Sequence, residues 1–139
     1  MDIGVFIFDT DYSINISELA RELEERGYES LFVPEHTHIP TSRRSPFPGG
    51  GELPKQYSHT LDPFVSLGFA AASTKNLKIG TGICLLPQRD PIVTAKSIAS
   101  LDLMSKGRFV LGLGGGWNVD EMENHGVTYK TRFAMMKEH

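Results

Sequence analysis

The sequence predicts an α/β fold in which four strands, each followed by a helix, form a parallel sheet. Two observations support this prediction: four short apolar segments alternate with helical segments, and the helices carry clear start and stop signals. Apolar runs without alternating polar residues are typical of strands buried on both faces of a parallel sheet. Regular alternation of strands and helices also favours right-handed crossovers between neighbouring strands.

The first strand-helix unit and the second strand lie before residue 34. Ile3–Phe8 is apolar almost throughout and is predicted to form the first strand. A helix is predicted over Asn15–Arg26, with Asn15 as its cap, Glu18 as the reciprocal partner and Gly27 as the stop signal. The second predicted strand is Ser30–Val33.

Two aspartate-proline pairs mark the starts of the next two helices. Asp62-Pro63 and Asp90-Pro91 each place a capping side chain before a proline in the first helical turn. The third strand is predicted between these starts, at Lys78–Leu85, and the fourth at Phe109–Leu113. Shorter helices are predicted after the fourth strand, at Val119–Asn124 and Arg132–His139.

A polar segment at about residues 37–60 separates the second strand from the next helix. It is rich in proline, glycine and serine and contains the run Gly49–Gly51. Connections of this length in compact domains tend to be functional or mobile. We therefore expect Thr37–His59 to be poorly ordered in the absence of a ligand.

Composition limits the class of protein. The 139 residues are 40% hydrophobic and 22% charged, which suits a single globular domain over residues 1–139. A net charge of −3 gives no reason to expect nucleic acid as a partner, and no apolar run is long enough to span a membrane. Met1–Gly4 lacks the basic region of a signal peptide, and the lone Cys84 cannot form an internal disulfide. These features favour the cytoplasm.

Three consecutive glycines follow the fourth predicted strand directly. Gly114–Gly116 and the adjacent Trp117 stand at its carboxyl end, where ligands bind in α/β folds. Glycines there let a backbone approach a ligand closely. The segment lacks the spacing of a dinucleotide fingerprint and the helix that should follow it, so we reject that interpretation.

Glu35 and His36 follow the second strand at the same edge of the sheet. A histidine at this place can exchange a proton at neutral pH, although a strand-end histidine can also simply cap or fill space. His38 and His59 are expected to be loop residues. The histidines show no metal-ligand spacing with Cys84, so no metal site is predicted.

Several motifs occur in a specific order and cover nearly the whole chain outside the 37–60 loop. They are Leu31-Phe32-Val33-Pro34-Glu35-His36, Asp62-Pro63, Ile79-Gly80-Thr81-Gly82, Arg89-Asp90-Pro91, Leu101-Asp102 with Ser105 and Gly107-Arg108, and Gly112 to Trp117 with Glu121 and Gly126. Together they resemble the luciferase-like monooxygenase superfamily. The similarity is greatest to its deazaflavin (coenzyme F-420) dependent oxidoreductase branch.

The resemblance implies a (β/α)8 TIM barrel, of which this chain holds the first four β/α units as an N-terminal half-barrel. A half-barrel leaves two strand edges and one sheet face uncovered, which favours association with another chain. We therefore expect a homodimer or larger homo-oligomer, held by apolar contacts from Ile3–Phe8 and Phe109–Leu113.

The resemblance also implies hydride transfer at the ring of coenzyme F-420, or alternatively of flavin mononucleotide (FMN), with a small-molecule substrate when the full barrel is present. It implies catalytic roles for Glu35 and His36, and a bulge or a cis peptide at Gly82-Ile83. It implies that the cofactor is bound by Thr81, Gly82, Ile83, Gly114, Gly115, Gly116 and Trp117. In the family, loops of the second half hold most of the cofactor's phosphate-bearing tail.

Other interpretations stay open on the sequence alone. The chain can be a non-catalytic, self-associating half-barrel with no bound redox cofactor, or a phosphate-binding α/β module. Asp120 and Glu121 suit either a polar contact in the site or the acidic first turn of a helix. Asp102 and Arg108 suit a structural pair, and Arg89 suits either an anionic ligand or a solvated surface position.

Overall fold

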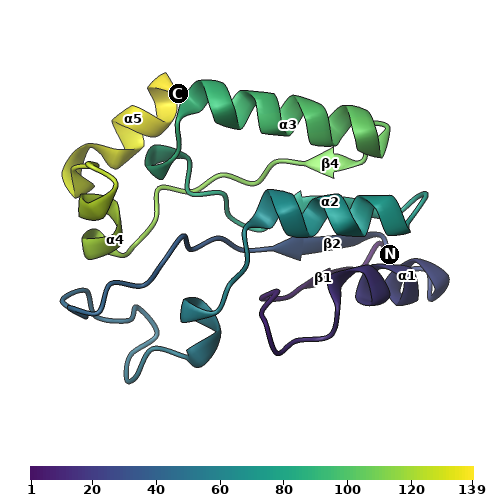
Figure 1. Ribbon diagram of the computed structural model, residues 1–139, viewed down its shortest axis with the longest axis horizontal. Coiled ribbons are helices and arrows are strands. Elements are labelled where there is room, and N and C mark those ends of the chain that lie inside the picture. Colours follow the sequence, from purple (N-terminus) through teal and green to yellow (C-terminus); the bar gives the residue numbers. More distant parts are fainter.

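A parallel sheet of four strands, in the order β1-β2-β3-β4, organises residues 1–139 in the computed structural model (Figure 1). The strands are β1 (Gly4–Phe6), β2 (Ser30–Val33), β3 (Lys78–Thr81) and β4 (Phe109–Val110). Consecutive strands are neighbours and all pairs are parallel, which confirms the predicted topology and excludes a doubly wound sheet.

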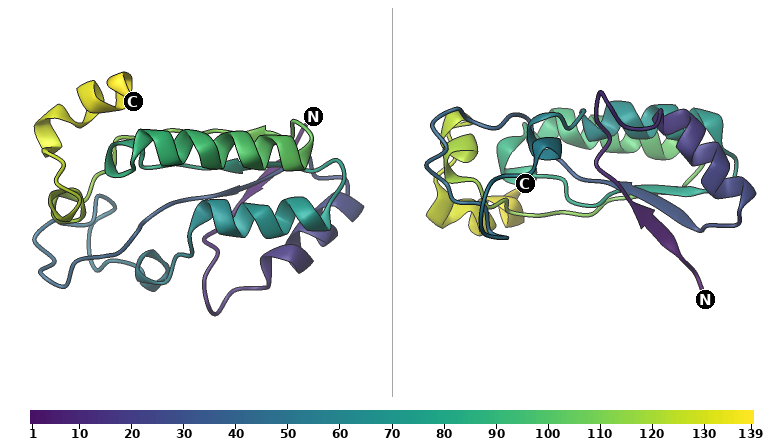
Figure 2. Two further views of the ribbon diagram at one scale, coloured as in Figure 1. Left: turned by 45° about the horizontal axis from the view of Figure 1, so that its top comes forward. Right: turned by 90° about the horizontal axis from the view of Figure 1, so that it is seen from below.

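The three long helices cover one face of this sheet, as Figure 2 shows. They are α1 (Ile16–Glu25), α2 (Pro63–Ser73) and α3 (Pro91–Ser105), and each follows one of the first three strands. The short helices α4 (Val119–Asn124) and α5 (Arg132–Glu138) gather with the 37–60 loop at the carboxyl ends of the strands (Figure 1). No helix combines the length and the apolar character needed to cross a membrane.

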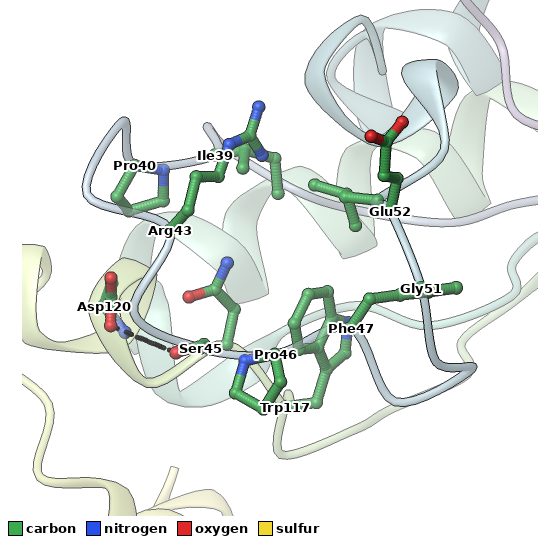
Figure 3. Close-up of a pocket in the computed structure, with 12 residues that line it drawn as sticks. Ile39, Pro40, Arg43, Ser45, Pro46, Phe47, Gly51, Glu52, Trp117 and Asp120 are labelled. Carbon is green, nitrogen blue, oxygen red and sulfur yellow. Dashed lines mark hydrogen bonds between the residues drawn. The ribbon is translucent and has the colours of Figure 1, made fainter.

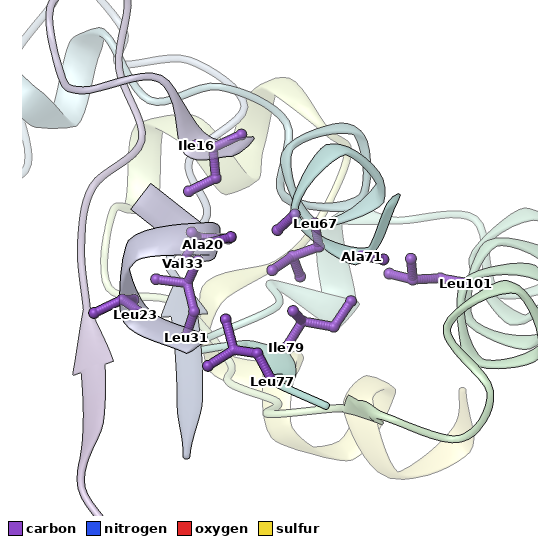
Figure 4. Close-up of a cluster of buried hydrophobic side chains, with 11 residues drawn as sticks. Ile16, Ala20, Leu23, Leu31, Val33, Leu67, Ala71, Leu77, Ile79 and Leu101 are labelled. Atoms are coloured by element: carbon purple, nitrogen blue, oxygen red, sulfur yellow. The ribbon is translucent and has the colours of Figure 1, made fainter. Parts of the chain in front are cut away.

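The hydrophobic core lies between these helices and the sheet (Figure 4). It consists of eleven buried side chains: Ile16, Ala20, Leu23, Leu31, Val33, Leu67, Ala70, Ala71, Leu77, Ile79 and Leu101. Because side chains alternate along a strand, only every second residue of β2 and β3 enters this layer. The residues between them face the opposite side of the sheet.

The predicted helix caps form with one difference. Asp62 and Asp90 accept hydrogen bonds from backbone N–H groups in the first turns of α2 and α3. Asn15 accepts a hydrogen bond from the N–H of Ser17, whereas no hydrogen bond joins it to Glu18. The helix α1 is therefore capped by Asn15 alone rather than by a reciprocal pair.

The chain inserts one extra residue after β3. Gly80 pairs with Val110, and Cys84, four residues later, pairs with Leu113, which is only three residues later on its own strand. This offset is a bulge, so β3 ends at Thr81 and not at Leu85 as predicted. The resemblance implied either a bulge or a cis peptide at Gly82-Ile83. The structure has the bulge, and every peptide bond is trans.

The first and fourth strands are also shorter than predicted. β1 ends at Phe6 instead of Phe8, and β4 ends at Val110 instead of Leu113. The backbones that follow β3 and β4 converge closely, since a Cβ on Gly112 would lie 2.3 Å from the carbonyl oxygen of Thr81. Irregular close packing past the ends of β3 and β4 replaces the regular ladder that the apolar pattern predicted there, whereas one ladder hydrogen bond, from the N–H of Ile7 to the carbonyl oxygen of Phe32, continues beyond β1.

Arg108 binds the carboxyl end of α2 and not Asp102, so the predicted pair is wrong. Its guanidinium donates to the carbonyl oxygens of Ala71, Thr74 and Leu77 at 2.7 to 3.2 Å. The last carbonyl groups of a helix lack partners within the helix and favour a positive charge. Arg108 therefore ties the end of α2 to the start of β4.

The face of the sheet opposite the helices is uncovered in this chain (Figure 2). Phe6 and Val110 are 56% and 40% exposed, although both belong to strands. Ile3 and Leu113, which flank these edge strands, are also exposed. Apolar side chains on an open face, together with two unpaired strand edges, are features of a surface that contacts another element.

Candidate functional site

An open cavity of about 410 Å³ lies at the carboxyl ends of the strands. We call it the strand-end cavity; its lining residues are Phe6, Phe8, Pro34, Glu35, His36, Tyr57, Ile83, Leu85, Gly114, Gly115, Gly116 and Trp117. All predicted site residues except Thr81 and Gly82 belong to this set. Its volume is in the range of small-molecule sites, and most of its surface is apolar.

The three glycines form a wall of the cavity because side chains would not fit there. A Cβ on Gly114 would lie 2.6 Å from a methyl carbon of Ile83, and one on Gly115 would lie 2.8 Å from the ring of Phe133. Gly116 has a φ of +75°, which L residues with side chains rarely adopt. The glycines therefore keep this wall at backbone level.

Thr81 and Gly82 lie behind the cavity. The Thr81 hydroxyl donates to the carbonyl oxygen of Gly112 at 2.8 Å and accepts from its N–H at 2.9 Å, so it holds the two strands together at the bulge. A Cβ on Gly82 would lie 2.3 Å from the ring of Phe6. Gly82 thus makes room for an aromatic side chain that lines the cavity.

His36 is paired with Glu121 and not with its neighbour Glu35. Its Nδ1–H donates to Oε2 of Glu121 at 2.7 Å, and both side chains are buried. A carboxylate that accepts from one imidazole nitrogen fixes the ring orientation and the tautomer. The rings of Tyr57 and Trp117 lie 5.3 and 5.6 Å from that of His36, so aromatic walls surround the histidine.

Sequence reasoning left the role of Glu121 open between a site contact and the acidic first turn of a helix, and the structure shows both. It lies in the first turn of α4, where Asn118 caps its N–H, and its side chain reaches His36 across 85 residues of sequence. The signal that could have found it is its place shortly after the glycines at the strand end.

Glu35 is held by an ion pair instead. Its Oε1 accepts from Nε of Arg89 at 2.7 Å and its Oε2 accepts from the N–H of Leu85 at 2.6 Å. Arg89 also donates to Asp62 at 2.9 Å. Arg89 is therefore neither a free anion site nor a solvated surface charge. Both carboxylate oxygens of Glu35 are occupied by protein donors, so Glu35 shapes the cavity wall.

Comparison with known proteins agrees with this geometry. The family model of luciferase-like monooxygenases matches residues 1–139. The chain belongs to this family. An uncharacterized protein of Mycobacterium tuberculosis is 44% identical over 142 residues, which cover 100% of this chain and 50% of that protein. The chain thus spans about half the length of this relative.

Solved structures of luciferase-like enzymes share the fold at low sequence identity. One is the oxygenating constituent of 3,6-diketocamphane monooxygenase from Pseudomonas putida in complex with FMN, with a TM-score of 0.76 and 22% identity over 99% of this chain and 37% of that chain. Another is coenzyme F420 dependent tetrahydromethanopterin reductase from Methanopyrus kandleri, with a TM-score of 0.68 and 23% identity over 99% and 38%. A parallel α/β half-barrel is thereby established.

Cys84 is a packing residue in this luciferase-like half-barrel. Burial, followed by the negative charge of Glu35, raises the pKa of its thiol to about 12. The thiol therefore stays protonated at neutral pH and is a poor nucleophile. Nowhere do three side chains of His, Cys, Asp or Glu come together as a set of metal ligands.

A second hollow of about 400 Å³, which we call the loop cavity, is shown in Figure 3. Its lining comes mainly from residues 39–53 and includes the charged Arg43 and Glu52. Trp117 lines both cavities and forms part of the wall between them. The 37–60 loop is therefore built against the site at the strand ends.

Asp120 anchors this loop to α4. It accepts hydrogen bonds from the hydroxyls of Ser42 and Ser45 and from the N–H of Arg44. The Ser42 hydroxyl, the Arg44 N–H, the Ser45 hydroxyl and the charge of Arg44 together lower the pKa of Asp120 from its ordinary 3.8. A lowered pKa in the folded state means that ionised Asp120 stabilises the anchored loop.

We expect Asp120→Asn to release the anchored part of the loop, because the amide nitrogen cannot accept the hydrogen bonds that Asp120 accepts now. Amide hydrogen exchange at Ser42 to Ser45 should become faster in the variant, while exchange at 49–51 should be fast in both proteins. In the wild type this protection should be full above pH 3.8 and lost as the pH falls through the lowered pKa of Asp120. Equal exchange in variant and wild type at neutral pH would contradict the anchor.

Proposed function

We propose that this chain is part of a flavin- or deazaflavin-dependent oxidoreductase, in which the strand-end cavity receives the cofactor ring beside a small-molecule substrate. The observation that carries the proposal is the convergence of His36, the glycine wall and the aromatic side chains in one cavity. Membership of the luciferase-like family supports the same reaction class. The lone Cys84 is in keeping with the cytoplasmic location that we also propose.

The residues of the cavity suit a flat, partly polar ring. The lining is mostly apolar and aromatic, and Gly114–Gly116 let a planar group lie against the backbone. Behind this wall the side chain of Gln88 is buried with both polar atoms unpaired. Its Nε2 would lie 3.6 Å from a Cβ on Gly116, so a polar group lacking a partner borders the proposed ring site.

Hydride transfer is the chemistry that a flavin or deazaflavin ring supplies when bound. His36 exchanges a proton with the substrate at Nε2, the ring nitrogen that makes no hydrogen bond to the protein, while Glu121 holds Nδ1. The rings of Tyr57 and Trp117 lie beside this buried histidine and shield it from water on their sides. Glu35 keeps the cavity wall in place through Arg89 and the backbone of Leu85.

Coenzyme F-420 is the cofactor that we propose, with FMN as the alternative. The structure of a monooxygenase in complex with FMN and the structure of a coenzyme F420 dependent reductase both share the fold of this chain. The test is to titrate the purified chain with each cofactor separately and to follow fluorescence quenching. We expect saturable binding of F-420 and tighter binding of F-420 than of FMN.

The matched variants for this titration are Gly114→Val and Gly68→Val. A side chain at Gly114 would collide with Ile83 in the cavity, whereas a side chain at Gly68 meets open space. Loss of binding in Gly114→Val but not in Gly68→Val places the cofactor at the glycine wall. Failure of the folded chain to bind either cofactor at high concentration would overturn the proposal.

The alternative function is a non-catalytic half-barrel that associates with itself and binds no redox cofactor. The uncovered sheet face favours it, because Phe6 and Val110 are exposed there beside two strand edges. The same titration separates the two proposals, since this alternative requires a folded chain that binds neither F-420 nor FMN.

Association through the open face is compatible with either function. We predict a homodimer or larger homo-oligomer at micromolar concentration, measured by sedimentation. Val110→Lys should shift the protein toward monomer, because it places a charge on the uncovered face at an edge strand. Val65→Lys is the control, since Val65 is exposed on α2 on the other side of the molecule. A wild-type monomer would show this prediction to be wrong.

A further inference from the structure

A continuous row of hydrogen-bonding groups leads from the strand-end cavity to the surface. The buried pair of His36 and Glu121 forms its inner end. The other carboxylate oxygen of Glu121, Oε1, accepts from the N–H of Thr37 at 2.9 Å and from its hydroxyl at 3.3 Å. The same hydroxyl lies 2.7 Å from Nε2 of His125, which is exposed. Three contacts therefore join a buried imidazole to a surface imidazole.

The hydrogen-bond directions along this row are consistent with one another. Asn124 donates from Nδ2 to Nε2 of His38 at 2.9 Å, so neutral His38 carries its proton on Nδ1. That Nδ1–H donates to the Thr37 hydroxyl at 3.0 Å. A hydroxyl accepts two hydrogen bonds and donates one, so Thr37 can accept from His38 while it turns its single proton toward either Oε1 of Glu121 or Nε2 of a His125 that carries its own proton on Nδ1.

No other group offers His36 a comparable exit for a proton. Glu35 is its sequence neighbour, but both oxygens of Glu35 are occupied by Arg89 and Leu85. Tyr57 and Trp117 face His36 with their rings, and no hydrogen bond joins either of them to it. A ligand in the strand-end cavity would cover the remaining side of the imidazole. The Nδ1 side, through Glu121, is then the polar route to solvent.

We propose that Glu121, Thr37 and His125 form a proton relay between His36 and bulk water. A proton on His36 passes from Nδ1 to Oε2 of Glu121. The carboxyl group then turns so that this protonated oxygen faces the Thr37 hydroxyl and gives the proton to it. The hydroxyl gives its own proton to Nε2 of His125. At the end His36 has lost one proton, His125 has gained one, and the other two groups are unchanged. The reverse sequence carries a proton inward.

Only the purpose of the relay rests on the proposed function. The relay would let His36 exchange protons with solvent while substrate and cofactor close the cavity. The path itself is a property of this chain and can be measured without a cofactor. Glu121 and Thr37 act on His36 and do not touch the cavity ligand, so they are positioning and relay residues rather than catalytic ones.

The test follows the exchange of the His36 Nδ1 proton with water by NMR in protein labelled with 15N. Thr37→Val removes the hydroxyl and keeps the shape, while Thr37→Ser keeps the hydroxyl. We expect exchange to slow by about tenfold or more in Thr37→Val and to stay within about twofold of wild type in Thr37→Ser. Wild-type exchange in Thr37→Val, or equal slowing in both variants, would overturn the relay.

A second pair of variants keeps the test decisive if Thr37→Val disturbs the fold, which amide spectra would show. His125→Phe removes the outer end of the relay at an exposed position, and His139→Phe changes another exposed histidine outside it. The relay requires slower exchange in His125→Phe and unchanged exchange in His139→Phe. Unchanged exchange in His125→Phe would exclude it as the outer end. Loss of F-420 and FMN binding with normal proton exchange would count against the proposed function and leave the relay intact.

Discussion

In the oxidoreductase that we propose, with the full barrel present, His36→Ala is expected to lower turnover by about 10²- to 10⁴-fold, the range over which a positioned general acid or base contributes. The loss should fall on kcat more than on KM, because proton transfer assists the transition state and not substrate binding. His38→Ala should lower turnover less than His36→Ala, since His38 is half-buried in the loop and reaches the site only through Thr37. Steady-state kinetics with F-420 and with FMN measure both variants.

Glu121→Gln makes this prediction sharper because it separates the proton-transfer role of His36 from its orientation. Glutamine can still accept a hydrogen bond from Nδ1 of His36 but carries no charge to stabilise the protonated ring. We expect a smaller loss of kcat than in His36→Ala, because the orientation of the ring is kept while the charge beside it is removed. Equal and negligible effects of His36→Ala and His38→Ala would remove the proton-transfer role of His36.

Arg89→Ala is expected to reduce the free energy of unfolding by about 3–5 kcal/mol, as measured by urea denaturation. The side chain of Glu35 is only 1% exposed, and removal of Arg89 leaves its charge buried without a counter-ion. The N–H of Leu85 would remain as the hydrogen-bond partner, which does not compensate a buried charge. The cavity wall around Glu35 should therefore become more mobile as the free energy of unfolding falls.

Arg26→Ala is the matched control for this measurement. Arg26 pairs with Glu22 on the surface of α1, where both side chains are largely exposed. Pairs of this kind contribute about 0–1 kcal/mol. The double variant Arg89→Met with Glu35→Leu should recover much of the stability lost in Arg89→Ala, because no charge is then left buried. A loss below about 1 kcal/mol in Arg89→Ala would contradict the buried-pair account.

Local sequence signals determined much of the fold. The apolar runs placed all four strands, and the caps at Asp62 and Asp90 placed the starts of α2 and α3 correctly. Such signals act over a few residues, so the chain carries them before it folds. Strand ends were less accurate, since β1, β3 and β4 all stop earlier than predicted, and past the ends of β3 and β4 close contacts between backbones replace the ladder. The apolar pattern alone does not record those contacts.

In the site, likewise, some features were predictable from the sequence and others depend on the tertiary structure. The sequence by itself placed His36, the glycine wall and Trp117 at one edge of the sheet, because parallel strands bring their carboxyl ends together. Only the tertiary structure decided that His36 pairs with Glu121, 85 residues away, and that Glu35 pairs with Arg89. Side-chain pairing depends on which groups reach one another after packing, and adjacent residues of a chain that leaves a strand face different surroundings. The partners of buried charges are therefore a property of the packed molecule.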